Sequence, residues 1–126
     1  MKAVKRPVWE ATLPDARAIT RYIERFAPCD VDSGLVEEYY RGQCANLREL
    51  PLSKITLGDR DHNRRMPALE ARYARKPVET MPPIVVQNGE IEDGSHRFRV
   101  AKKLKLKTIL CYVVSDAPPR ATPGPS

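Results

Sequence analysis

The fold is decided by the stretch from Pro82 to Leu106, which reads PPIVVQNGEIEDGSHRFRVAKKLKL. The apolar run over residues 84–87 is typical of a buried strand, and Asn88-Gly89 favours a two-residue hairpin turn into a second strand over residues 90–92. The Asp-Gly-Ser sequence that follows ends this strand and opens a helix that runs to about Leu106, with its apolar residues on one side. This stretch therefore predicts a β-hairpin followed directly by a helix.

The flanking segments extend this core in both directions. Residues 108–114 predict a last apolar strand. On the N-terminal side the pattern predicts a short strand over residues 54–57, a charged loop over 58–65, and a short helix over 67–75 that starts at a proline. The order strand, helix, hairpin, helix, strand predicts an α+β domain with a small mixed sheet over residues 50–116.

The first 49 residues predict two helices. Apolar residues at helical spacing indicate an amphipathic helix over about residues 15–27; they are Ile19, Tyr22, Ile23 and Phe26. A second helix is predicted over about residues 33–41, ended by Gly42. We interpret residues 1–49 as a two-helix appendage whose apolar faces either cover the following domain or bind a protein partner.

Composition limits the class of protein and its location. The 126 residues suit one domain, or one small domain with an appendage. No apolar run is long enough to span a membrane, the basic N-terminus lacks the apolar segment of a secretory signal, and the three cysteines form no CxxC pair. We therefore expect a cytoplasmic protein without membrane, zinc site or disulfide framework. The proline-rich residues 117–126 predict a disordered tail.

Positive charge is concentrated near the C-terminal end. The formal net charge is +6, and six lysines and arginines without an acidic residue lie between His96 and Lys107. Such a run suits a partner that carries phosphate, such as nucleotide or DNA. A solvated helix face explains the same run equally well.

The junction at residues 92–97 has the features of an anion site. A helix N-terminus presents backbone N–H groups and a partial positive charge, and Gly94 allows a ligand to approach the backbone closely. Ser95 can cap the helix or donate its hydroxyl, and His96 and Arg97 fall in the first turn. Arg97 there opposes the helix dipole, a conflict that a bound phosphate would remove. An ordinary capped helix with a surface arginine is the alternative.

Four parts of the chain together resemble the superfamily of ParB N-terminal domains and sulfiredoxin. These parts are Leu50–Ile55, Pro83–Val86, Asp93–Leu104 and Thr108–Val114. The resemblance covers about half of the chain and is most specific at the Asp-Gly-Ser-His-Arg box. It implies a small α+β domain that binds a nucleoside triphosphate. Members of the superfamily include CTP-binding partition proteins, ATP-dependent sulfiredoxin and ADP-dependent free-serine kinases.

The resemblance assigns the nucleotide phosphates to the box and to one arginine of the preceding loop. These residues are Gly94, Ser95, His96 and Arg97, with Arg64 or Arg65 from the loop. Sulfiredoxins have their catalytic cysteine where this chain has Ser95, which excludes reduction of a sulfinic acid. Partition proteins continue into a helix-turn-helix domain that this sequence lacks, which weakens sequence-specific DNA recognition.

The resemblance to free-serine kinases implies a catalytic role for one carboxylate. Asp93 matches the aspartate implicated in their catalysis, and it is also the candidate ligand for Mg²⁺. Their base, a glutamate after the first strand, has no clear counterpart, although Asp59 or Asp61 could serve as base or Mg²⁺ ligand. We assign His96 to catalysis together with Asp93.

Two hypotheses about function follow. The first is a nucleotide-dependent phosphotransferase or nucleotidase that uses ATP, ADP or CTP with Mg²⁺ and transfers phosphate to a small hydroxyl compound or water. The alternative is a non-catalytic accessory module of plasmid or phage type. Such a module would bind nucleotide, DNA backbone along the basic helix over residues 95–107, or a protein partner through the N-terminal helices.

Overall fold

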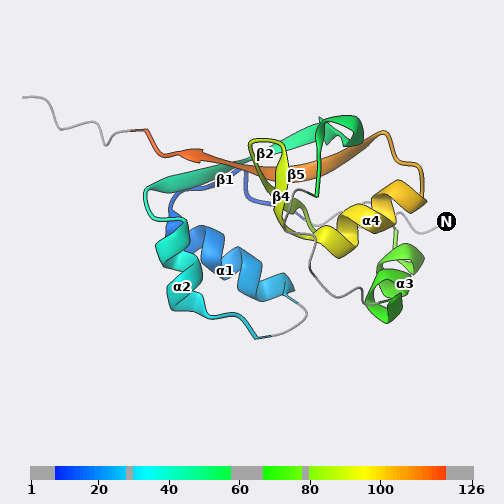
Figure 1. Ribbon diagram of the computed structural model, residues 1–126, viewed down its shortest axis with the longest axis horizontal. Helices are drawn as coiled ribbons and strands as arrows, with labels where there is room; N and C mark the ends of the chain where they lie inside the picture. Colours follow the sequence, from blue (N-terminus) through cyan, green and yellow to red (C-terminus); the bar gives the residue numbers. More distant parts are fainter. Residues whose placement is uncertain (1–7, 28–29, 58–66, 78–79, 119–126) are drawn as a thin grey trace, which may run out of the picture.

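The computed structural model describes residues 8–27, 30–57, 67–77 and 80–118. Their elements in chain order are β1 (Thr12–Leu13), α1 (Ala16–Phe26), α2 (Ser33–Tyr39), β2 (Gln43–Pro51), the 3-10 turn η1 (Leu52–Lys54), α3 (Pro67–Arg75), β3 (Ile84–Gln87), β4 (Glu90–Asp93), α4 (Ser95–Lys103) and β5 (Thr108–Asp116). Together they form a mixed α+β fold. In Figure 1 the blue and cyan helices α1 and α2 lie together, as do the green and yellow helices α3 and α4.

The sheet has five strands in the order β1-β2-β5-β3-β4. Its longest ladder joins β2 to β5, antiparallel from Gln43 opposite Asp116 to Pro51 opposite Thr108. β3 runs parallel to β5, and the other neighbouring strands are antiparallel, so the sheet is mixed as the sequence predicts.

The N-terminal segment contributes strands as well as the two predicted helices. α1 and α2 form where the sequence predicts helices, but β1 and β2 join the sheet, and the predicted boundary between residues 49 and 50 falls inside β2. The sequence of β2 does not indicate a strand, because Cys44 and Ala45 are buried next to each other while Arg48 and Glu49 are both exposed. No alternation of period two marks this strand.

The prediction of a short strand over residues 54–57 is wrong. The chain turns instead of extending: Leu52–Lys54 is a 3-10 turn, and the Ile55 amide donates to the Leu52 carbonyl. Within the described part of this segment, only Thr56 then pairs with the sheet. It forms an isolated bridge to Glu90, in which its amide donates to the Gly89 carbonyl. Pairing at one residue replaces the expected strand.

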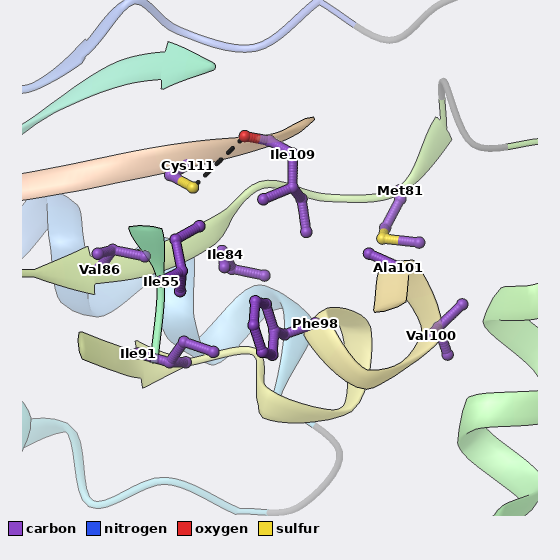
Figure 2. Close-up of a cluster of buried hydrophobic side chains, with 10 residues drawn as sticks. All are labelled: Ile55, Met81, Ile84, Val86, Ile91, Phe98, Val100, Ala101, Ile109 and Cys111. Carbon is purple, nitrogen blue, oxygen red and sulfur yellow. Dashed lines mark hydrogen bonds between the residues drawn. The ribbon is translucent and has the colours of Figure 1, made fainter. Parts of the chain in front are cut away.

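Each face of the sheet carries a hydrophobic cluster. Along β5, Ile109 and Cys111 point to one cluster and Tyr112 and Val114 to the other, as the alternation of side chains in a strand requires. α4 covers the first face, and Figure 2 shows its Phe98 directed toward the side chains of the sheet. α1 covers the second face with the apolar stripe that predicted the helix.

The hairpin and α4 place the candidate site. Asn88 and Gly89 both have positive φ angles, 54° and 77°, as the predicted two-residue turn requires. α4 ends at Lys103, earlier than predicted, because Lys105 adopts a left-handed conformation with φ 59°. The Leu106 amide then donates to the Ala101 carbonyl, which closes the helix in a Schellman motif.

Candidate functional site

The start of α4 is built on one glycine. Gly94 connects β4 to α4 with a φ of 100°, in the left-handed region that favours glycine. A Cβ on Gly94 would lie 2.7 Å from Cγ2 of Ile84, so the position also lacks space for a side chain. The N-cap of α4 is Gly94, which has no side chain to cap the first turn, and Ser95 is the first residue of the helix rather than its cap. The helix N-terminus is therefore held close to β3.

Arg97 is buried at this helix start and bonded to protein oxygens. Its side chain is only 3% exposed; Nη1 donates to the carbonyls of Pro82 and Pro83 at 3.0 and 2.9 Å, and Nη2 donates to Oδ2 of Asp93 at 3.0 Å. The alternative of a surface arginine is wrong. Asp93 and the two carbonyls compensate the conflict between Arg97 and the helix dipole within the protein.

Asp93 combines burial with access from solvent. Burial raises the pKa of its carboxyl group, and the neighbouring Arg97 and His96 oppose that rise. The Asp93 side chain is nevertheless 22% exposed to solvent. A carboxyl group whose charged form is disfavoured, yet which is partly exposed to solvent, is suited to accept or hold a proton.

A second acid–base pair connects α3 to the same helix start. Nδ1 of His96 lies 3.2 Å from Oε2 of Glu70, and their side chains are 12% and 11% exposed. A carboxylate that accepts a hydrogen bond from Nδ1 orients the imidazole ring and leaves Nε2 for other contacts. The sequence does not predict a role for Glu70. The available signal is its position three residues before Tyr73, which places both on one face of α3.

α1 also reaches the site from the opposite side. The Tyr22 hydroxyl donates to the Pro83 carbonyl, which also accepts from Arg97. Burial raises the pKa of Tyr22, so this hydroxyl keeps its proton. From the sequence, Tyr22 is predicted only as part of an apolar stripe. Neither its hydroxyl nor the Pro82–Pro83 carbonyls leave a pattern in the sequence that indicates this contact.

The five residues of the Asp-Gly-Ser-His-Arg box, Asp93 to Arg97, meet at the start of α4 as predicted. Asp59, Asp61, Arg64 and Arg65 lie outside the described residues. Over ranges 8–27, 30–57, 67–77 and 80–118, no group of three or more His, Cys, Asp or Glu residues could hold a metal ion. The Mg²⁺ site at Asp93 stays a prediction, as does catalysis by Asp93 and His96.

Comparisons with known proteins give no relatives: no family model, no curated protein and no solved structure matches the chain. The resemblance to ParB and sulfiredoxin domains therefore stays a prediction that rests on the residues named above. Among the described residues, no helix is long and apolar enough to cross a membrane.

Proposed function

We propose that this chain binds a nucleoside polyphosphate with its phosphates against the start of α4, and transfers a phosphoryl group to a small hydroxyl compound or to water. One observation carries the proposal: a helix start whose N-cap is a glycine is flanked by two largely buried pairs, Asp93–Arg97 and Glu70–His96. Buried charges lower stability unless they are paired, and they gather at functional sites.

Binding would rest on the helix N-terminus and on fixed positive charge. Backbone amides at a helix start attract phosphate, and the close approach of the backbone at Gly94 adds access. Arg97 would contribute its positive charge rather than a hydrogen bond to the phosphates, since its Nη1 and Nη2 groups already donate to protein oxygens. With a proton on each ring nitrogen, His96 would donate from Nδ1 to Glu70 and from Nε2 to a phosphate oxygen.

Catalysis would rest mainly on Asp93. Phosphoryl transfer requires positioning and neutralisation of charge more than covalent chemistry. Asp93 would orient the acceptor hydroxyl and take up its proton, a role that its raised pKa supports. Mg²⁺ neutralises charge on the phosphates when it is bound. As the alternative to taking up the proton, Asp93 would hold Mg²⁺ together with substrate oxygens, since Mg²⁺ commonly uses one or two carboxylates together with phosphate.

A thermal-shift panel tests binding. ATP, ADP, CTP and GTP are compared, each with and without Mg²⁺. A nucleotide at 100 times its Kd should stabilise the fold by about 2.7 kcal/mol. His96→Ala should remove most of the shift, whereas Lys103→Ala, exposed at the other end of α4, should retain it. Equal losses in the two variants would indicate diffuse electrostatic attraction and contradict the site.

Asp93→Asn tests catalysis separately from binding. Asparagine keeps an oxygen that can accept from Arg97, so nucleotide affinity should persist or improve. Turnover, measured as phosphate release and as transfer to serine, should fall by about two or more orders of magnitude. Turnover close to that of the wild type would remove Asp93 from the mechanism.

A non-catalytic module that binds DNA backbone is the second candidate. The observation in its favour is the set of exposed lysines at and beyond the end of α4: Lys102, Lys103, Lys105 and Lys107. Such a module would bind duplex DNA with an affinity that falls steeply with salt concentration, and show no turnover with any nucleotide. Alanine at Lys102 and Lys103 together should then reduce the salt slope.

A further inference from the structure

A small pocket lies between the C-terminal ends of α1 and α3, with a volume of about 210 Å³. Its walls come from separate parts of the chain: Trp9 before β1, Phe26 at the end of α1, Tyr73 and Lys76 at the end of α3, and Thr80 and Met81 before β3. Long-range folding therefore assembles a pocket that no single sequence motif encodes.

Among the residues that the structure describes, the lining includes three aromatic side chains and no carboxylate. The rings of Trp9 and Phe26 have centroids 5.6 Å apart and meet at 69°, so they form a corner and do not stack on each other. Tyr73 adds a third ring from α3, and Lys76 is the one charged residue among the described part of the lining. Such a surface suits a flat, electron-rich ring that can stack on aromatic side chains and approach a cation.

Two contacts connect the pocket to the start of α4. Pro82 lines the pocket, and its carbonyl accepts a hydrogen bond from Nη1 of Arg97 at 3.0 Å. On α3, Tyr73 lines the pocket, and Glu70, about one helical turn earlier, contacts His96. A ligand that extends from the pocket along α3 therefore meets the helix start that we propose for phosphate.

The size of the pocket limits its occupant. Pockets that enclose whole drug-sized molecules measure about 300–1,000 Å³. A volume of about 210 Å³ suits one ring system and leaves the rest of the ligand outside. A larger cleft of about 500 Å³ along α1 shares Trp9 and carries three arginines beside Glu10 and Asp15, but its lining includes neither Pro82 nor any residue of α3.

We infer that this pocket takes the base of the nucleotide whose phosphates lie at the start of α4. The inference rests on the proposed function, and it adds the part of the site that selects a nucleoside over a simple polyphosphate. The base stacks among Trp9, Phe26 and Tyr73, and the ribose spans the distance to α4.

Trp9 provides the readout, because it is the only tryptophan of the chain. Its fluorescence, corrected for nucleotide absorbance, is followed in the full chain while ATP, adenosine or inorganic tripolyphosphate is added, and thermal shifts are recorded in parallel. ATP and adenosine should quench Trp9. Tripolyphosphate should raise the melting temperature with little or no quenching.

Tyr73→Ala tests the pocket by substitution. It should weaken ATP binding about tenfold, within the range expected for loss of one stacking partner. It should leave tripolyphosphate binding unchanged, which also shows that the variant is folded. Tyr73→Phe should restore the affinity for ATP. Leu104→Ala, a truncation of a 40% exposed side chain at the end of α4, is the control and should change neither ligand.

The possible outcomes separate this inference from the proposed function. If ATP binds without quenching Trp9 and Tyr73→Ala keeps its affinity, the base pocket is wrong and the phosphate site stands. If adenosine quenches Trp9 but tripolyphosphate does not bind, the base pocket stands and the phosphate site fails. If none of the three ligands produces quenching or stabilisation, both are wrong.

Discussion

The two ends of α4 both carry positive charge, but the fold treats them differently. At the start, Arg97 is 3% exposed and donates hydrogen bonds to Asp93 and two carbonyls. At and beyond the end, four lysines are exposed, and the helix closes in a Schellman motif through Lys105 and Leu106. The lysines stand where the helix dipole favours cations, whereas Arg97 stands where the dipole opposes it.

This difference shows which part of a basic run requires a functional explanation. The lysines at the end need none, because solvent and the dipole both stabilise them. The start instead combines burial, a charged pair and an N-cap glycine that no other residue replaces without strain. Counting charges along the sequence does not separate the two ends; burial and hydrogen-bond partners do.

The largest contrast between the ends should come from removing one cation at each. Arg97→Ala leaves the Asp93 carboxyl group without its counter-charge and removes the Arg97 donor from two buried carbonyls, of which that of Pro83 keeps its hydrogen bond from Tyr22. It should lower the free energy of unfolding by about 3–5 kcal/mol. Lys103→Ala should change it by no more than about 0.5 kcal/mol. Urea denaturation measures both free energies of unfolding. A cost of under about 1 kcal/mol for Arg97→Ala would contradict the inference that the contacts of the guanidinium group stabilise the fold.

Glycine substitutions sharpen the contrast by separating backbone strain from lack of space. Gly94 and Gly42 both have a positive φ, 100° and 78°, but a Cβ at Gly42 would meet nothing within 4 Å. Alanine at either position should cost about 1–2 kcal/mol of strain. Gly94→Ala should cost about 1–3 kcal/mol more, because its Cβ overlaps Ile84. Equal losses in urea denaturation would show that the close approach at the helix start is not rigid.

The pH dependence of stability tests the charge state at the helix start. Burial raises the pKa of Asp93 above its ordinary value of 3.8, so the folded chain keeps this proton to higher pH than the unfolded chain does. Stability from this group is therefore lost as pH rises above 3.8 through the folded pKa. Relative to the wild type, Asp93→Asn should gain in unfolding free energy over that range. If the difference in unfolding free energy between Asp93→Asn and the wild type stayed constant from acid to neutral pH, a raised pKa of Asp93 would be excluded.

The smallest expected effect lies at the other end of α4 and has the opposite sign. Lys105 adopts a left-handed conformation that disfavours residues with a Cβ. Lys105→Gly should therefore stabilise the fold by about 0.5 kcal/mol, the relief of strain minus the entropy that glycine adds to the unfolded chain. Thermal melts against wild type measure it. A destabilised variant would show that the Lys105 side chain makes contacts that matter more than its backbone.

Local patterns in the sequence predict much of the fold. Asn88-Gly89 predicts the hairpin because few residues other than glycine and asparagine tolerate its backbone angles. The helical spacing of Ile19, Tyr22 and Ile23 predicts α1 because all three are buried in the cluster beneath it. β2 is missed for the converse reason: it is held by its long ladder with β5, and its side chains do not alternate between core and solvent.

The candidate site is predictable only where it is contiguous in sequence. The segment Asp93 to Arg97 is visible because a glycine, a histidine and an arginine open one helix. Glu70 on α3 lies 26 residues from its partner His96 in the chain, and Tyr22 on α1 lies 61 residues from Pro83. The carbonyls of Pro82 and Pro83 are backbone groups, whose role depends on where Arg97 points. Tertiary packing, not local pattern, brings these groups together.

The central claim is that phosphate binds at the start of α4. The most direct measurement is a titration of the ¹⁵N-labelled chain with ATP and Mg²⁺, followed through the shifts of backbone amide resonances. The account predicts that the largest shifts fall on Gly94, Ser95 and His96, with small changes at Lys102 and beyond. Largest shifts over residues 102–107, or none along α4, would contradict it.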